Sequence, residues 1–222
     1  MRTAILGALL VVCATVAAAI AGPYSDRVKK PVPTAIPDIV IRKPPGEPYG
    51  AIGDKWRQLG GATGIMGKPL IDETNAANGG RYVEFEWGFI FWRGDLGAHN
   101  VLYPMSRKWV GMGRETGFGY PVTDTISSPR GRCNDYENGG TICWAQKNGR
   151  SSAVYGAIRV KWVQIGREHA GCGFPLTDEF QWGSMRRSNF EFGYITWSPN
   201  AGAIVHGCPG FQGDVELNPV PN

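Results

Sequence analysis

The chain repeats itself at an interval of 53 residues, and this period constrains the fold more than any other feature. A Lys-Trp pair occurs three times, at Lys55-Trp56, Lys108-Trp109 and Lys161-Trp162. A further tryptophan closes each copy, and these residues are Trp92, Trp144 and Trp197. Self-similarity at a fixed period indicates a repeat protein, in which each unit is stable because it packs on its neighbours. We therefore predict that all six tryptophans belong to a repeated core.

Each copy begins with the pattern of a short helix. Apolar residues recur at positions i, i+4 and i+7, which places them on one stripe of about two helical turns. The three stripes are Ile52-Trp56-Leu59, Met105-Trp109-Met112 and Ile158-Trp162-Ile165. A glycine follows each stripe, where helices commonly end, at Gly60, Gly113 and Gly166. Because so short a helix is unstable alone, we expect packing to hold it.

A hairpin pattern ends each copy. The phrase FEWGFIFW at residues 85–92 returns as FEFGYITW at residues 190–197. We expect a strand at 81–85, a tight turn at 86–88 and a returning strand at 89–92. Side chains alternate along a strand, so Ile90 shares a face with Trp92, and we interpret this face, with its counterparts Ile142 and Ile195, as the core between one unit and the next. The opposite face is predicted to be free to meet a ligand, and it holds Phe89, Phe91, Thr141, Cys143, Tyr194 and Thr196.

The composition favours short strands joined by many turns, since the chain holds 32 glycines and 16 prolines. The expected fold class is α+β and mainly β. We predict three tandem units, each a short helix plus a β-hairpin, in a propeller-like or arc arrangement. The repeat domain is expected over residues 49–208, with units at about 49–102, 103–155 and 156–207.

The segments around the repeats predict export. Arg2 is followed by an apolar run and by small residues, so residues 1–21 are predicted to be a cleaved signal peptide. A retained membrane anchor is the alternative, but the run is rich in alanine and barely long enough to span a bilayer. The proline-rich residues 22–48 are expected to be a linker, and residues 209–222 a C-terminal tail.

Four cysteines remain once the predicted signal peptide is removed. An even number in an exported chain favours two disulfides. A middle hairpin that turns about Asn138 places Cys133 directly opposite Cys143, at a separation that a disulfide tolerates. We therefore predict a Cys133–Cys143 bond and, by elimination, a bond between Cys172 and Cys208.

These motifs resemble the LGFP repeat over about residues 49–207. The segments that carry the resemblance are GAIGDKWRQLGGATGIMGKPL at 50–70, GAIRVKWVQIG at 156–166, GFPLTDE at 173–179 and the two hairpin phrases. The resemblance implies a protein exported by a mycolic-acid-containing actinobacterium, or by some fungi, which attaches to the cell wall through its polysaccharide. It also implies an array similar to a small propeller. Family members often carry an enzyme domain such as a mycolyltransferase, whereas here we find three full copies, a degenerate middle turn at 136–140, and expect no catalytic domain.

Catalytic chemistry is not predicted. The chain has no G-x-S-x-G elbow and no H-E-x-x-H motif, and His99, His169 and His206 lack metal-ligand spacing. We therefore expect no cofactor and no metal. A wall-active hydrolase is the alternative, because paired carboxylates at Asp72-Glu73 and Asp178-Glu179 are the groups that a glycosidase uses. They recur at one repeat position, however, which favours a structural role.

Glycan binding needs only aromatic rings and a few polar groups, because sugar C–H faces stack on rings and hydroxyls pair with Asp and Arg. The candidate residues are Phe89, Phe91, Tyr194, Trp87, Asp72, Asp178, Arg81 and Arg186. The competing interpretation is structural, with the repeated arginines 81, 132 and 186 bridging the repeated aspartates 72, 124 and 178.

The expected partner is cell-wall polysaccharide, of the arabinogalactan or peptidoglycan type, at a secreted or cell-wall location. A partner protein in the envelope, or a purely structural role there, remains open. A net charge of +4 is too small and scattered to indicate nucleic acid. We expect no stable membrane insertion after signal cleavage.

Overall fold

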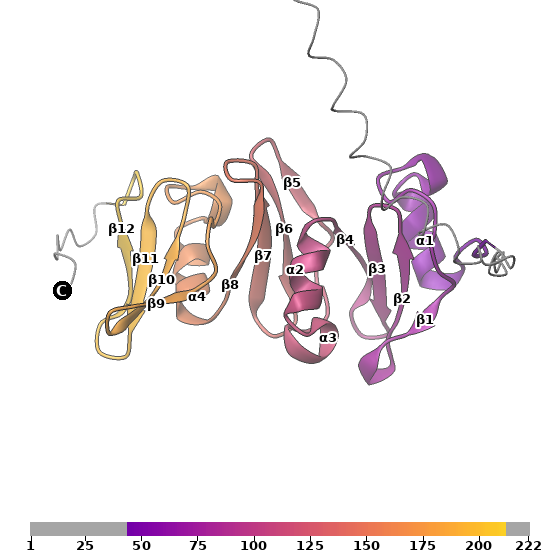
Figure 1. Ribbon diagram of the computed structural model, residues 1–222, viewed down its shortest axis with the longest axis horizontal. Helices are drawn as coiled ribbons and strands as arrows, with labels where there is room; N and C mark the ends of the chain where they lie inside the picture. The colour runs from indigo at the N-terminus through magenta and orange to yellow at the C-terminus, as the bar shows by residue number, and fades with distance from the viewer. Residues whose placement is uncertain (1–43, 212–222) are drawn as a thin grey trace, which may run out of the picture. The chain divides into compact units, whose positions relative to one another are not determined.

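The computed structural model describes residues 44–211, which form three antiparallel sheets of four strands each together with short helices (Figure 1). The mainly β fold class is confirmed. Within these residues the three sheets remain separate and do not close into a propeller. The predicted signal peptide, residues 22–43 of the linker and residues 212–222 of the tail lie outside the described residues.

The sheets follow the chain. The first contains β1 (Thr74–Asn75), β2 (Arg81–Phe85), β3 (Gly88–Arg93) and β4 (Gly97–Leu102). The second contains β5 (Ile126–Ser128), β6 (Gly131–Tyr136), β7 (Gly140–Ala145) and β8 (Arg150–Val154). The third contains β9 (Phe180–Trp182), β10 (Met185–Asn189), β11 (Tyr194–Ser198) and β12 (Gly202–His206). The predicted hairpin is therefore the central strand pair of each sheet, and a further strand flanks it on either side.

One helix precedes each sheet, as the apolar stripes predicted. These helices are α1 (Gly50–Gln58), α2 (Met105–Gly111) and α4 (Gly156–Gln164). A left-handed glycine follows each of them, with φ of 97° at Gly60, 85° at Gly113 and 92° at Gly166. The chain then makes a short turn of helix, at η1 (Gly61–Thr63), α3 (Arg114–Gly117) and η3 (Arg167–His169). A last such turn, η2 (Ala77–Gly79), joins β1 to β2.

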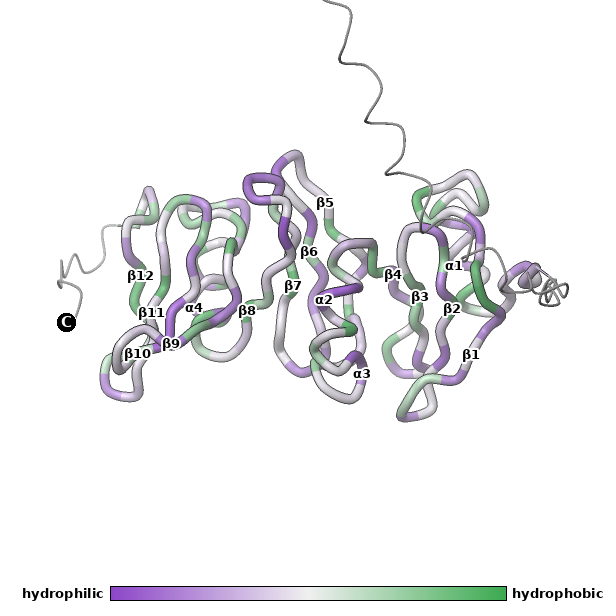
Figure 2. Tube along the Cα trace, viewed as in Figure 1, coloured by the Kyte–Doolittle hydropathy of each residue, from purple (hydrophilic) through white to green (hydrophobic). Residues whose placement is uncertain are grey.

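Two of the helices are packed between sheets. Helix α2 contacts β4 of the first sheet and β7 and β8 of the second, and α4 contacts β7 of the second sheet and β11 and β12 of the third. Helix α1 contacts β3 and β4 of its own sheet. Figure 2 shows hydrophobic and hydrophilic positions mixed along the strands and helices of all three units. Each unit is therefore stabilised by the helix of the next one, as expected of a repeat array.

The predicted core tryptophans are confirmed. Trp56, Trp109 and Trp162 are buried, and each lies in a different cluster of buried residues. Three other tryptophans are partly buried and pack against the same clusters, and these are Trp92, Trp144 and Trp197. The indole N–H of each helix tryptophan donates a hydrogen bond to a glycine carbonyl in the following loop, at Gly67, Gly119 and Gly173, over 2.9 to 3.0 Å.

The proline after each of these glycines holds the loop against the hairpin. Pro69 bridges Phe85, Pro121 bridges Tyr136 and Pro175 bridges Phe190. In the first unit the carboxylate of Glu86 accepts the backbone N–H of Lys68, and in the third that of Glu191 accepts the N–H of Phe174, each over 2.9 Å. The repeated Trp, Gly-x-Pro and turn acid are therefore parts of one hydrogen-bonded unit.

The prediction about strand faces needs correction. Ile90 packs with Trp56 inside the first unit, so the shared Ile-Trp face is the core of its own unit. The opposite face makes the contact with the next unit, because Phe91 packs edge-on against Trp109 with ring centroids 4.6 Å apart. The predicted freedom of this face is therefore wrong for four of its residues, which are buried: Phe91, Thr141, Cys143 and Thr196.

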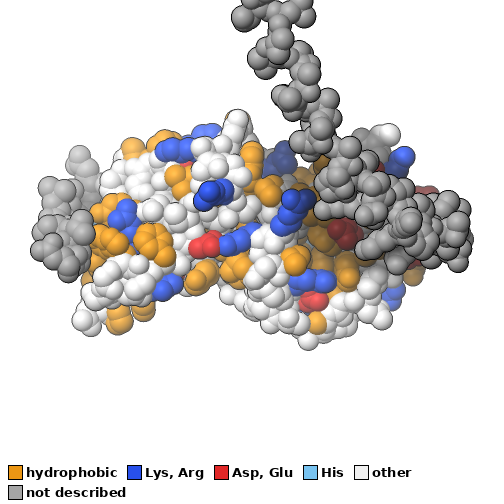
Figure 3. All heavy atoms as spheres, viewed as in Figure 1, with side chains coloured by type: hydrophobic (Ala, Val, Ile, Leu, Met, Phe, Trp, Pro, Cys, Tyr) orange, Lys and Arg blue, Asp and Glu red, His pale blue; other side chains and the backbone are white. Residues whose placement is uncertain are grey.

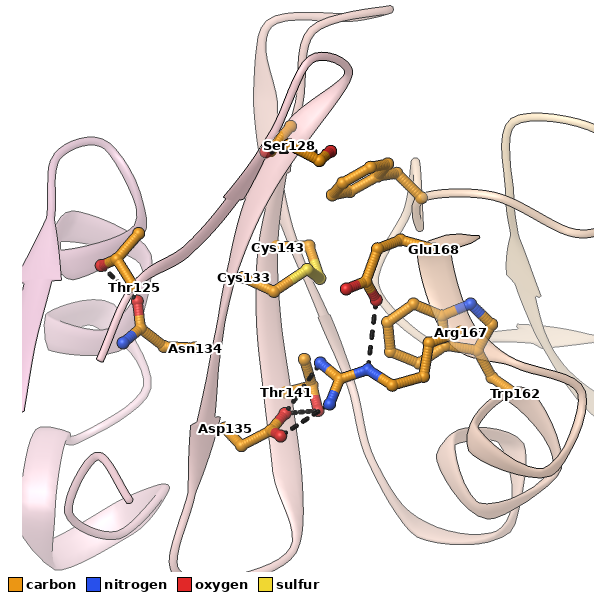
Figure 4. Close-up of a disulfide and its surroundings, with 12 residues drawn as sticks. Thr125, Ser128, Cys133, Asn134, Asp135, Thr141, Cys143, Trp162, Arg167 and Glu168 are labelled. Carbon is orange, nitrogen blue, oxygen red and sulfur yellow. Dashed lines mark hydrogen bonds and ion pairs between the residues drawn. A yellow bond between two sulfur atoms is a disulfide. The ribbon is translucent and has the colours of Figure 1, made fainter. Parts of the chain in front are cut away.

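Both predicted disulfides are present. Cys133 and Cys143 are register partners on β6 and β7, with Cα atoms 4.1 Å apart. Cys172 joins Cys208, with Cα atoms 4.6 Å apart, and so ties the loop after α4 to the end of β12. The first bond lies on the sheet face that α4 covers, and it contributes to the same core cluster as Trp162 (Figure 4).

Candidate binding surfaces

The repeated aspartates join neighbouring units. Asp124 of the second unit accepts a hydrogen bond from Lys55 of α1 over 2.8 Å and another from the backbone N–H of Asn100 over 3.2 Å. Asp178 makes the same pair of contacts with Lys108 and with the N–H of Ala153. The lysine of each of the first two Lys-Trp pairs is therefore one half of a latch between units, and the aspartate of the next unit is the other half.

The first aspartate makes a related contact without a preceding unit. Asp72 accepts the backbone N–H of Gly46 over 2.9 Å. The segment before α1 thus supplies the backbone donor for Asp72, as β4 does for Asp124 and β8 does for Asp178. Because Asp72 and Asp178 both serve as structural acceptors in this way, their geometry favours a structural role over the predicted contact with a glycan.

The pKa of Asp124 follows from its place in the latch. Burial alone raises the pKa of this carboxyl, but hydrogen bonds from His99 and Lys55 outweigh burial and lower the pKa to about 2. The carboxylate is therefore charged at every physiological pH. It is committed to its lysine partner, which agrees with a structural function.

The repeated arginines pair with glutamates. Arg81 binds Glu73, and Arg186 binds Glu179 with its Nε 2.8 Å from the carboxylate. The prediction that these arginines bridge the repeated aspartates is wrong, because each binds the glutamate that follows the aspartate. The aspartates are already bound to lysines of the preceding helix or to the N-terminal segment. These contacts also occupy both Asp-Glu pairs that a hydrolase would require. Among residues 44–211 no group of three His, Cys, Asp or Glu is placed to hold a metal ion.

A buried charge network strengthens the junction between the second and third units (Figure 4). Arg167, the first residue of η3, binds Asp135 of β6 over 2.7 Å and Glu168 over 3.1 Å. Thr141 donates to Asp135 over 2.5 Å, and Arg159 reaches the same carboxylate. Burial raises the pKa of Asp135, but Arg167 and Thr141 lower it by more, so it remains ionised.

The junction between the first and second units is aromatic. Phe91 stacks on Tyr82 with centroids 4.9 Å apart, and the guanidinium of Arg114 lies over the Tyr82 ring at 4.6 Å. Phe89 is partly buried against the same cluster. Phe91 is 1% exposed and is therefore not accessible to a glycan. The ring of Phe89 contacts those of Tyr82, Phe91 and Tyr103.

The corresponding face of the third sheet is open, and we call it the terminal face. It is the side of β9–β12 opposite to α4, and no helix follows it within residues 44–211. Arg187 lies at 5.1 Å from the Trp182 ring and 3.7 Å from the Tyr194 ring. Tyr194 in turn stacks on His206 at 4.6 Å. In Figure 3, hydrophobic and basic side chains lie next to one another in the region of this sheet.

Polar groups take the place of apolar ones on the terminal face. The register aligns Arg187, Thr196 and His206 with Tyr82, Phe91 and Val101 of the first sheet. The Thr196 hydroxyl lies 2.8 Å from His206 Nε2. Burial, and then the charge of Arg187, lower the pKa of His206 below its usual range, so the ring is neutral at neutral pH.

A second candidate surface lies beside the hairpin turn of the first unit, and we call it the Trp87 groove. It has a volume of about 410 Å³ and is lined by Gly64, Ile65, Trp87, Leu102, Tyr103, Ser127 and Arg132. Trp87 is 60% exposed and Ile65 is 53% exposed, which is unusual for such large apolar side chains. Of the predicted aromatic glycan contacts, Trp87 is exposed, Tyr194 and Phe89 are partly exposed, and Phe91 is buried.

Another pocket, of about 330 Å³, lies at the start of α1. It is lined by Tyr49, Glu73, Arg81 and Trp92, among others. It thus contains the predicted Arg81, but that arginine is neutralised by Glu73. Arg186 is likewise paired, with Glu179.

The sequence-based set of glycan contacts did not include Trp182, Arg187 or His206 of the terminal face, and Arg132 was identified only as one of the three repeated arginines. A comparison of the copies position by position would have found the polar replacements on the last sheet. It would also have found Thr125 in the place of Glu73 and Glu179.

The fold and its junctions define a tandem-repeat protein, built of helix-plus-sheet units that are latched by Lys-Asp pairs. Residues 66–117 and 118–169 each match the LGFP repeat, so this part of the chain consists of two LGFP repeats. No curated protein matches the chain. The disulfides and the family together suggest an extracellular protein. Within residues 44–211 no helix has the length and apolar character needed to cross a membrane.

Proposed function

We propose that this chain is a secreted, non-catalytic module that binds cell-wall polysaccharide, and that the terminal face makes the principal contact. The observation that supports this is the partly exposed set of Trp182, Arg187, Tyr194 and His206 on a sheet face that is covered in the other two units. Aromatic rings stack on sugar C–H faces, and arginine and histidine pair with sugar hydroxyls.

The chemistry of the face favours a sugar over a further helix. A helix like α2 would place an apolar tryptophan against the sheet, as Trp109 does against Phe91. On the terminal face that tryptophan would remove water from Arg187 and His206 without giving them hydrogen-bond partners, which is costly. A polysaccharide supplies both apolar faces and hydroxyls, so it satisfies both kinds of group.

Binding to insoluble cell wall tests the proposal. The protein from residue 22 onward is mixed with wall from a mycolic-acid-containing actinobacterium, and with the same wall stripped of arabinogalactan, over a salt series. We expect binding that persists in salt and is lost on stripping. The double variant Trp182→Ala/Tyr194→Ala should bind about tenfold more weakly, since two stacking contacts are removed.

The matched control is Val160→Ala, which alters an exposed apolar side chain on α4. This variant should bind as the unchanged protein does. Binding that salt abolishes on both walls would contradict the proposal, because only the modest positive charge would then attract the protein. Capture of a wall protein instead of polysaccharide would also contradict it.

A further inference from the structure

The three units share an arginine whose charge is neutralised by a glutamate in two of them and not in the other. Each unit has an arginine at the same position, directly across the hairpin from the closing tryptophan, and these residues are Arg81, Arg132 and Arg186. In the first and third units a glutamate neutralises this arginine, in the pairs Arg81–Glu73 and Arg186–Glu179. In the second unit Thr125 occupies the glutamate position. Within residues 44–211 Arg132 has no carboxylate partner, and its guanidinium lies 5.9 Å from the Trp144 ring.

Thr125 has a clear role at the junction. Its hydroxyl lies 2.8 Å from the side-chain oxygen of Asn134 and 3.2 Å from the carbonyl oxygen of Asn100, and it accepts the N–H of Leu102 over 3.3 Å. A glutamate could not replace these short contacts. The threonine therefore fastens the second unit to the first, and as a consequence it leaves the positive charge of Arg132 uncompensated.

That charge borders the Trp87 groove. The groove brings Arg132 and Ser127 of the second unit together with Trp87 and Ile65 of the first. One wall is thus aromatic and apolar, and the other carries a cation and a hydroxyl. The guanidinium binds carboxylates in a two-pronged geometry, and such charge-assisted hydrogen bonds are among the strongest in proteins.

Tyr103 completes the polar side of the groove. Its hydroxyl donates to Glu84 over 2.7 Å, and burial, followed by the hydrogen bond to Glu84, raises the pKa of Tyr103 to about 12. The phenol is therefore neutral, and with its proton directed to Glu84 its oxygen can accept a hydrogen bond from a ligand hydroxyl.

We propose that the Trp87 groove is a subsite for an acidic sugar, with the carboxylate on Arg132 and the C–H face of the ring on Trp87. The inference deepens the proposed function, on which it rests for the glycan nature of the ligand. It adds a second contact surface, distinct from the terminal face, and a preference for a negatively charged residue in the chain of sugars.

Titration with small sugars tests this directly. The indole N–H resonance of Trp87 is followed by NMR as digalacturonic acid is added, and the neutral galactose disaccharide with the same linkage is added in a parallel series at equal ionic strength. We expect the acidic sugar to shift this resonance with saturation, and the neutral sugar to bind about tenfold more weakly, because it lacks the charge-assisted bond to Arg132.

Variants assign the effect to the two residues. Arg132→Gln should weaken binding of the acidic sugar about tenfold and abolish the preference over the neutral one. In Trp87→Ala the reporter is lost, so binding is followed at Arg132 Nε–H, and it should also fall. The matched control is Arg57→Gln, which removes an exposed arginine in the first unit and should change nothing. Both groove residues are exposed, so all variants should keep the thermal midpoint of the parent.

Other outcomes separate this inference from the proposed function. Equal response to both disaccharides, or none, would overturn the acidic-sugar subsite. Inorganic phosphate that binds at Arg132 while digalacturonic acid does not would overturn the proposal and replace it with a simple anion site. If Arg132→Gln binds cell wall normally and Trp182→Ala/Tyr194→Ala does not, the groove is overturned and the proposed function stands. If the unchanged protein binds digalacturonic acid but does not bind cell wall, the groove stands and the proposed function is overturned.

Discussion

The first and third sheets present the same face to very different surroundings. In the first sheet this face carries Tyr82, Phe89 and Phe91, and helix α2 covers it. In the third sheet it carries Arg187, Tyr194 and His206, and no helix follows within residues 44–211. The backbone register is the same in both. The position of a unit in the array therefore decides whether a strand residue stabilises the fold or faces a partner.

The largest difference is expected when a tryptophan is removed from each face. Trp109→Ala should lower the free energy of unfolding by about 3–5 kcal/mol, because a fully buried ring and its hydrogen bond to Gly119 are lost. Trp182→Ala, on the terminal face, should cost less than about 1 kcal/mol. Urea unfolding followed by circular dichroism measures both, and equal losses would show that the terminal face is part of the core.

The disulfides offer a second comparison, between the covered face and the end of the array. Replacing Cys172 and Cys208 by alanine should cost about 4 kcal/mol, since this bond closes a long loop, and replacing Cys133 and Cys143 should cost about 3 kcal/mol in the same chain-entropy model. Unfolding in urea without reductant tests the order. A greater loss at Cys133–Cys143 would indicate that its packing under α4 outweighs its loop length.

The latches should contribute less, and their effect should depend on pH. The pKa of Asp124 is lowered to about 2 in the folded protein, against about 4 in an unfolded chain. The charged form is thus favoured by folding, so its contribution is fully present above pH 4 and is lost as the pH falls towards 2. Asp124→Asn should flatten this part of the stability profile, as measured by thermal midpoints between pH 5 and 2. An unchanged profile would place the acid sensitivity elsewhere, with Asp135 as the next group to vary.

The smallest effects concern the repeated lysine. Lys55→Met and Lys108→Met each break a latch and should cost about 0.5–1 kcal/mol, as expected of partly exposed ion pairs. Lys161→Met should cost close to nothing, because no unit follows it within the described residues to supply the aspartate. A large loss at Lys161 would reveal a further partner for the end of the array.

The sequence predicted the elements whose cause is local or periodic. Trp56, Trp109 and Trp162 were identifiable because each copy needs one large buried ring at the same position. Cys133 and Cys143 could be paired because a hairpin has a fixed register. The outer strands β1 and β5 were missed, because both are short and lack a clear alternation.

The binding surfaces were harder to predict. Periodicity tells which residues share a strand face, but not which neighbour covers that face, so Phe91 was assigned to solvent although α2 buries it. The partner of the repeated arginines was misplaced by one residue, because the lysine of the preceding unit competes for the aspartate. Arg132 stood out only when three equivalent environments were compared in space.

The contact between Gly46 and Asp72 has a consequence for how such arrays change in length. The backbone segment before α1 gives Asp72 the donor that a preceding unit gives Asp124 and Asp178. At each junction an aspartate carboxylate thus accepts a backbone N–H, and the same contact is made at the start of the array, where no unit precedes the aspartate within the described residues. A gene duplication that inserts one whole period would place each latch residue opposite a suitable partner. An insertion of any other length would leave the aspartate that follows it without the lysine and the backbone N–H that bind it.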